Sequence, residues 1–209
     1  MNRFVCTTVC LAFAPTVLGA SPPPLYPMEV HSWPSTLKTA PGAGVNLGKF
    51  RIRFEDTTLD QVRNAASLGI VRHRGDASES IHWLCYTFAQ RGVPFRLWFT
   101  SSEMSGGTAI DGVVAVRIGT SRPTLDCPSL PMELSPVSLD APVWVGSSAG
   151  SVARLMGAPS HVQGVWRSYD FQSKVAGKCD GGYDFLSSLA IRLENGLVSE
   201  IHSNQTTSC

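Results

Sequence analysis

Apolar and polar residues alternate along several short segments of this chain, and turn residues separate the segments. The clearest examples are Phe50 to Phe54 and Phe95 to Phe99, and strands are also expected at Ile81 to Phe88, Leu186 to Leu193 and Leu197 to Ser203. Alternation with a period of two predicts strands that bury one face and expose the other. The pattern therefore predicts antiparallel strands joined by short connections.

Two other segments show helical spacing. Thr58-Leu-Asp-Gln61 has the sequence of a capping box at the start of a helix, which Gly69 is expected to end. A second helix is expected from about Ser148 to Met156, closed by Gly157. Each helix precedes a group of strands, so the pattern predicts a helix followed by an antiparallel meander, twice.

The motif W-x-x-Y-x-F occurs once in each half, at Trp83 to Phe88 and at Trp166 to Phe171. Two further landmarks keep the same order around it: Gly69 corresponds to Gly157, and Asp111-Gly112 corresponds to Asn195-Gly196. Both dipeptides also predict two-residue hairpin turns, because their residues tolerate positive φ angles. We therefore predict an α+β fold of two tandem units, each a short helix region packed on an antiparallel β-meander.

The predicted boundaries follow from these segments. Residues 1–20 contain a single cation, an apolar run and small residues at the end, which is typical of a secretory signal peptide. Residues 21–47 are rich in proline and glycine and are predicted to be a tail or linker. The two units are expected at 48–133 and 143–209, with a linker at 134–142.

Composition and charge narrow the classes of function. The chain has 43% hydrophobic and 16% charged residues, which is ordinary for a globular protein with a core. It carries 17 Lys and Arg against 16 Asp and Glu, and loss of the signal with Arg3 would leave it formally neutral. Electrostatic binding to nucleic acid is therefore not supported, and no segment after residue 20 is apolar and long enough to span a membrane. We expect an exported protein, periplasmic or extracellular.

Four cysteines follow the predicted signal: Cys85, Cys127, Cys179 and Cys209. An even number in an exported chain favours two disulfides. In the second unit Cys179 lies in the turn after the first strand, and the third strand returns toward that end of the sheet, where Cys209 follows. We therefore predict the bridges Cys179–Cys209 and, within the first unit, Cys85–Cys127.

Three motifs of the second unit are Val152-Ala-Arg-Leu-Met-Gly-Ala-Pro159, Val165-Trp-Arg-Ser-Tyr169 and Asn195-Gly-Leu-Val198. Together they resemble the repeat of the β-lactamase inhibitory protein family and the related unit of small outer-membrane assembly lipoproteins of the SmpA/OmlA type. The resemblance implies two α+β units whose sheets form an extended, often concave surface that grips other proteins. The first unit departs from this pattern through a longer loop before its motif strand and an insertion at Ser101 to Thr108.

Strand parity separates the motif into two faces. In the second copy Trp166 shares a face with Ser168 and Asp170, which are expected to face water, and Trp83 corresponds to Trp166. Arg96 and Trp98 alternate with the apolar residues of their strand and are expected on the same exposed face. Tryptophan and arginine are typical anchors of protein interfaces. The alternative is that the tail or a loop covers these tryptophans. The residues predicted to bind another protein are Trp83, Arg96, Trp98 and Trp166.

The segment Gly146 to Gly150 fits the nucleophile-elbow motif G-x-S-x-G, with Ser148 as its serine and His202 following in the order found in hydrolases. A secreted serine hydrolase is therefore the alternative function. Against it, the first half shows hairpins rather than the strand-helix units of a parallel sheet. Ser148 also stands where Thr58 stands in the first unit, so a helix cap explains it better.

The histidines do not show the spacing of metal ligands, so no metal and no cofactor is expected. They are His31, His73, His82, His161 and His202. We predict a non-enzymatic, exported protein-binding module, which would act as an inhibitor, an immunity-type protein or an envelope assembly factor. Its expected partner is another protein.

Overall fold

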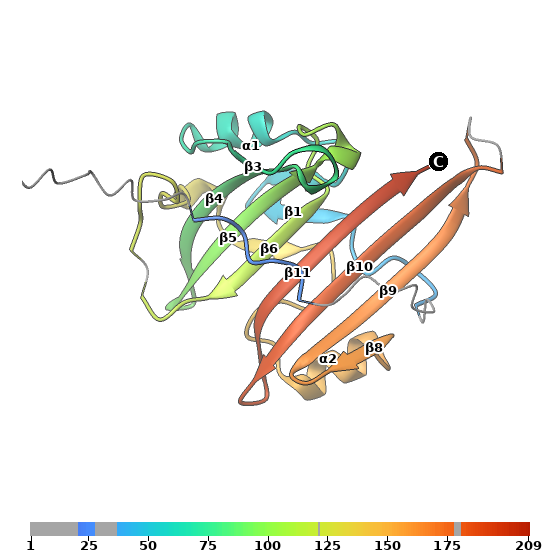
Figure 1. The fold of residues 1–209 in the computed structure, drawn as a ribbon. Coiled ribbons are helices and arrows are strands. Elements are labelled where there is room, and N and C mark those ends of the chain that lie inside the picture. Colours follow the sequence, from blue (N-terminus) through green and yellow to red (C-terminus); the bar gives the residue numbers. More distant parts are fainter. Residues whose placement is uncertain (1–20, 28–36, 121, 178–180) are drawn as a thin grey trace, which may run out of the picture.

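Strands dominate the computed structural model, which describes residues 21–27, 37–120, 122–177 and 181–209 (Figure 1). Within these residues 47% of positions are in strands and 14% in helices. The strands are β1 Gly44–Leu47, β2 Phe50–Arg53, β3 Arg72–Arg74, β4 Ile81–Gln90, β5 Val93–Ser102, β6 Gly112–Arg117, β7 Val137–Leu139, β8 His161–Gln163, β9 Trp166–Val175, β10 Tyr183–Glu194 and β11 Leu197–Ser208. The helices are α1 Leu59–Ala66 and α2 Ala149–Met156, with 3-10 turns at Ala77–Glu79, Glu103–Ser105 and Met132–Leu134.

Eight strands form one antiparallel sheet in the order β3-β4-β5-β6-β11-β10-β9-β8. Its two central strands come from opposite halves of the chain. β6 and β11 pair from Gly112 with Asn204 to Val116 with Glu200. Figure 1 shows the green strands of the first half continuing directly into the red and orange strands of the second. The two halves therefore share a single large sheet.

A smaller sheet in the order β2-β1-β7 packs on one face of the large sheet, here called the inner face. Val45, Ile52 and Val137 of the small sheet share one core with the inner-face side chains of the large sheet. Leu59 of α1 and Val152 of α2 belong to the same core. Segments predicted as tail and linker thus contribute β1 and β7 to the centre of the protein.

The first helix begins where the sequence predicts. The Thr58 hydroxyl accepts a hydrogen bond from the Gln61 amide, and the Gln61 side chain accepts one from the Thr58 amide, which confirms the capping box. The helix ends at Ser67, which takes the left-handed conformation with φ 53°, rather than at Gly69. Gly69 lies against Tyr86 instead, and a Cβ there would come within 2.8 Å of the Tyr86 hydroxyl. No helix in the described ranges is long and apolar enough to cross a membrane.

The two predicted hairpin turns have different outcomes. Asn195 and Gly196 connect β10 to β11 with φ angles of 50° and 75°, so this turn is confirmed. The turn predicted at Asp111-Gly112 is wrong, because Gly112 begins β6 and β6 pairs directly with β5. The Asp111 carboxylate instead accepts a hydrogen bond from the Ser102 amide at 2.7 Å, at the start of the connection between these strands.

The predicted α+β fold of two tandem units is wrong. The protein is mostly β, its large sheet runs through both halves, and its small sheet combines strands from the segments predicted as tail, first unit and linker. Alternation along a strand shows which face is buried, but not which distant strand lies beside it. Separate units would leave β6 and β11 with free edges, and their pairing satisfies those backbone groups.

Candidate binding face of the eight-stranded sheet

The side chains of the large sheet divide between two faces. On β4, Tyr86 points into the main core, whereas Trp83 and Cys85 belong to a separate cluster on the opposite face, here called the outer face. Register partners continue the outer face across the sheet, in the order Cys85, Trp98, Val114 and His202 on β4, β5, β6 and β11. The predicted division of the first motif into two faces is therefore confirmed.

Trp83 and Trp98 lie on the outer face but are buried, with exposed fractions of 3% and 4%. They pack with Val114 and with the disulfide between Cys85 and Cys127. The prediction that these two tryptophans face water is wrong. A loop carrying Cys127 covers them, as the alternative interpretation held.

This covering loop, residues 124–130, is fixed to the edge of β4. The Thr87 amide donates to the Pro128 carbonyl at 2.8 Å, and the Leu130 amide donates to the Thr87 carbonyl at 2.7 Å. Asp126 forms an ion pair with Arg72 of β3. The loop thus supplies hydrogen-bonding partners for the part of β4 that β3 is too short to reach.

An N-terminal segment, residues 21–27, crosses the outer face and is drawn in blue in front of β5, β6 and β11 in Figure 1. The Trp98 indole nitrogen donates to the Ser21 carbonyl at 2.9 Å. At the other end of the segment, the Tyr26 ring lies edge-on to His202, with centroids 5.9 Å apart. The Tyr26 hydroxyl lies 3.4 Å from the Ser188 hydroxyl on β10. A segment predicted to be a tail is therefore held against the sheet at both ends.

Tyr26 and Arg96 are partly buried where residues 21–27 cross the outer face. Burial raises the pKa of the Tyr26 hydroxyl; hydrogen bonds with Ser188 and Ser168 oppose the rise, and the charge of Asp170 adds to it. Arg96 is half-buried, with its guanidinium carbon 5.8 Å from the centroid of the Trp98 ring. Arg96, predicted to bind a partner, thus lies beside a tryptophan that is already enclosed.

The second half of the outer face carries a cluster of charged groups. The His202 Nε2 atom lies 2.7 Å from the Glu200 Oε1 atom, and both side chains are buried. The Arg192 Nη1 atom lies 3.6 Å from the other oxygen of Glu200. Trp166 covers this cluster, its ring edge-on to His202 with centroids 5.5 Å apart. The Glu200 carboxylate can be buried because the positive charge of Arg192 lies beside it.

Among the described residues, the outer face is least covered on β9, β10 and the second half of β11. Trp166 and Arg192 are half-buried there, and Gln172, Leu186 and Asn204 are exposed. We call these five residues the open part of the outer face. Of the four predicted binding residues, Trp166 belongs to the open part, Arg96 is half-buried, and Trp83 and Trp98 are enclosed.

The structure does not bring Ser148 and His202 together. The Ser148 hydroxyl accepts a hydrogen bond from the Ser151 amide at 3.1 Å, and α2 packs into the main core on the inner side. His202 lies on the outer face between Glu200 and Trp166. The large sheet separates the two side chains, and Ser148 has the geometry of a helix cap.

The predicted disulfide between Cys85 and Cys127 is present, which is compatible with an exported protein. Cys179 of the predicted Cys179–Cys209 bridge lies outside the described ranges. The predicted signal peptide, residues 1–20, and His31 also lie outside them. Within the described ranges, no three His, Cys, Asp or Glu side chains are grouped as metal ligands would be.

Sequence reasoning missed Arg192, Glu200 and Tyr26 on the outer face. Glu200 alternates with Ile201 in the same strand as His202, so strand parity could have placed it. Tyr26 gave no such signal, because its contact with His202 joins segments from opposite ends of the chain.

Comparison of the chain with protein-family models, curated proteins and solved structures gives no match. The geometry of the outer face therefore carries the functional argument.

Proposed function

We propose that this chain is an exported, non-enzymatic module that binds another protein on the outer face of its large sheet. It would act in the periplasm or outside the cell as an inhibitor, an immunity-type protein or an envelope assembly factor. The observation that carries the proposal is the segment 21–27. This face already holds a stretch of polypeptide, with Trp98 donating to the main-chain carbonyl of Ser21. The sequence resemblance to repeats that grip other proteins supports the same function.

The open part of the outer face is the surface we assign to the partner. Tryptophan and arginine contribute most of the binding energy at many protein interfaces, and Trp166 and Arg192 lie side by side on β9 and β10 as register partners. The Trp166 ring packs edge-on against the buried His202 ring. A half-buried aromatic ring in a fixed orientation loses little conformational entropy on binding.

Photo-cross-linking tests the location of this surface. A benzophenone amino acid replaces Leu186, which is 43% exposed on the outer face, or Leu155, which is 50% exposed on α2 and serves as the matched control. Incubation with an envelope extract should give a discrete protein adduct from position 186 and none from position 155. The same adducts from both positions, or none from 186, would overturn the proposal.

The partner identified in this way allows the interface to be measured. Trp166→Ala should weaken the complex by more than about 1 kcal/mol, because truncating a central tryptophan removes its buried contacts. Leu155→Ala should leave the affinity unchanged. Far-UV circular dichroism checks that Trp166→Ala keeps the fold, and a folded variant with unchanged affinity would exclude Trp166 from the interface.

A further inference from the structure

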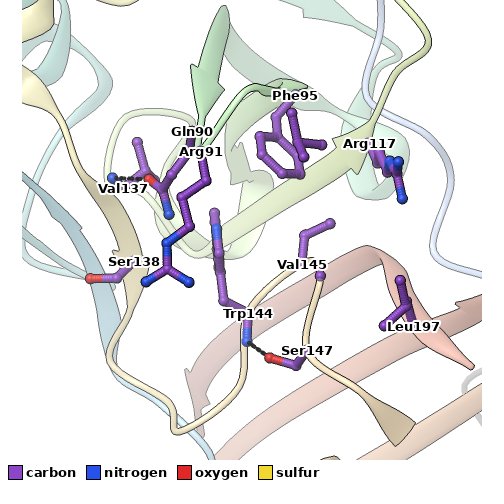
Figure 2. Close-up of a pocket in the computed structure, with 12 residues that line it drawn as sticks. Gln90, Arg91, Phe95, Arg117, Val137, Ser138, Trp144, Val145, Ser147 and Leu197 are labelled. Carbon is purple, nitrogen blue, oxygen red and sulfur yellow. Dashed lines mark hydrogen bonds between the residues drawn. The ribbon is translucent and has the colours of Figure 1, made fainter.

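A pocket of about 560 Å³ lies on the inner side of the large sheet, away from the outer face (Figure 2). Its lining comes from the turn between β4 and β5, the end of β6, β7, the loop before α2 and the start of β11. Both halves of the chain therefore contribute to it. Its volume is in the range of small-molecule sites.

The pocket has two cationic side chains and no acidic one. Arg91 and Arg117 are exposed, and neither has an ion pair among the described residues. Figure 2 shows them on opposite sides, with Trp144 and Val145 between them. An adjoining hollow of about 440 Å³ shares Arg117 and has one acidic residue, Glu194, whose carboxylate lies 2.8 Å from the Arg192 guanidinium. The electrostatic field in the pocket is therefore that of unpaired positive charge.

The Trp144 side chain supplies a hydrogen-bond donor without an acceptor. Its backbone amide donates to the Ser147 hydroxyl at 3.1 Å, but its indole nitrogen is buried and has no hydrogen-bond partner among the residues that the structure describes. In Figure 2 the indole ring rises between Arg91 and Val145 toward Phe95. Leaving a buried N–H unpaired costs about 1–3 kcal/mol, which an acceptor brought by a ligand would recover.

The other walls of the pocket are apolar. Phe95, Val137 and Val145 belong to the main core and also line the pocket. Leu197, at the rim of the pocket, is 38% exposed. Together with the Trp144 ring they form a surface suited to a flat hydrocarbon group. The polar side chains that line the pocket include Gln90, whose amide oxygen accepts a hydrogen bond from the Val137 amide at 2.9 Å.

We propose that this pocket binds a small organic molecule in which a carboxylate is attached to a flat apolar ring. The carboxylate would take its hydrogen bonds from one of the two guanidinium groups, Arg91 or Arg117, while the other adds its positive charge across the pocket. A turn of the Trp144 ring toward the ligand would bring the indole N–H to the same carboxylate, and all three groups are donors only. The ring would pack on Phe95 and Val145. This site is independent of the outer face, so its failure leaves the protein-binding proposal untouched.

Nuclear magnetic resonance of the 15N-labelled mature chain tests the proposal. The indole resonance of Trp144 is assigned by its loss in Trp144→Phe. Benzoate, 3-phenylpropionate and indole-3-acetate are titrated, each beside its neutral carboxamide. At least one acid should shift the Trp144 resonance to saturation, with its amide binding about tenfold more weakly because the guanidinium contacts are lost. Equal shifts with acid and amide, or no saturable shift with any acid, would overturn the proposal.

Variants of the two arginines locate the charge. Arg117→Gln and Arg91→Asn should each weaken binding of the acid by about fivefold or more. Asparagine is chosen for position 91 because Arg91 has a φ of 53°, which asparagine tolerates. Arg74→Gln, which removes an exposed cation on β3, is the matched control and should bind normally. An equal loss in Arg74→Gln would mean that net charge alone attracts the acid, and the site would be rejected.

Discussion

Asp111 is a buried residue that organises the connection between β5 and β6. Its carboxylate accepts hydrogen bonds from the Ser102 amide at 2.7 Å and from the Ser105 hydroxyl at 3.0 Å, and also from the Ser102 hydroxyl. Burial raises the pKa of this carboxyl group, and the hydrogen bonds from Ser102 and Ser105 oppose the rise. The loop therefore depends on one side chain for several of its hydrogen bonds.

Asp111→Ala should lower the free energy of unfolding by about 2–3 kcal/mol, because the Ser102 amide is left without an acceptor. Urea denaturation measures the loss. Asp111→Asn keeps one acceptor oxygen at the same position and should lose less. If the two variants were equally destabilised, the negative charge rather than the acceptor would be the contribution that matters.

A pair of histidine rings lies on β3 and β4 at the edge of the large sheet, and we expect stability to depend on pH there. His73 of β3 and His82 of β4 are register partners, with ring centroids 4.3 Å apart. Burial lowers the pKa of His82, the charge of His73 lowers it further, and Glu103 opposes the shift. The folded protein therefore takes up a proton at His82 less readily than the unfolded chain does.

This difference gives the direction of the pH dependence. The contribution of His82 is fully present above its unfolded pKa of about 6.5 and is lost as the pH falls through the lowered folded pKa. We expect the urea midpoint of the wild type to decrease more between about pH 7 and about pH 5 than that of His82→Gln, which lacks the titrating ring. Parallel profiles for the two proteins would contradict this assignment.

At the scale of elements, the covering loop 124–130 both protects the edge of β4 and encloses Trp83 and Trp98. The disulfide at Cys127 holds the loop over the two indole rings, and the loop excludes water from them. The same loop accounts for the burial of residues that strand parity alone would leave on an exposed face.

Replacing Cys85 and Cys127 together by serine should lower the free energy of unfolding by about 2–4 kcal/mol, because the unfolded chain loses a cross-link. The tryptophan emission should also shift to longer wavelength and become more accessible to acrylamide as the loop loosens. The wild type with its Cys85–Cys127 disulfide intact is the reference for both measurements. Loss of stability without any change in quenching would show that the hydrogen bonds of Thr87 alone hold the loop in place.

The elements that the sequence predicts well are those with a local cause. The capping box at Thr58 and the turn at Asn195-Gly196 each depend on neighbouring residues only. At Asp111-Gly112 the same turn signal fails, because the aspartate side chain bonds to Ser102 across the connection. β1 and β7, with 4 and 3 residues, are too short to show a period at all.

For the whole molecule, the decisive feature is the pairing of β6 with β11, here called the joint between the halves, and the sequence does not predict it. β6 is apolar on both faces, whereas β11 mixes apolar and polar residues, and nothing in either pattern selects one strand as the neighbour of the other. The outer face has the same limit. Trp98 and Ser21 meet because the fold brings the N-terminal segment across the sheet, which no local signal records.

The joint between the halves extends beyond the paired strands. β6 pairs with β11 only as far as Asn204, and the next backbone groups of β11 bond to loops of the first half. The Gln205 amide donates to the Asp111 carbonyl at 2.8 Å. The Thr207 amide donates to the Glu55 carboxylate at 2.6 Å, and the Thr207 hydroxyl and the Gln205 side chain donate to it at 2.8 and 2.9 Å. Glu55 thus takes the place of a strand at the end of the ladder.

Glu55→Ala should therefore loosen the last part of β11 without separating the halves. We expect a loss of about 2 kcal/mol in the free energy of unfolding, since three hydrogen bonds to a half-exposed charge are removed. Amide hydrogen exchange gives the local readout, because Thr207 should exchange faster while Gln205, bonded to the Asp111 carbonyl, stays protected. Faster exchange at both amides would mean that Glu55 supports the β6–β11 pairing as a whole, and the joint would then unfold as one unit rather than open from its end.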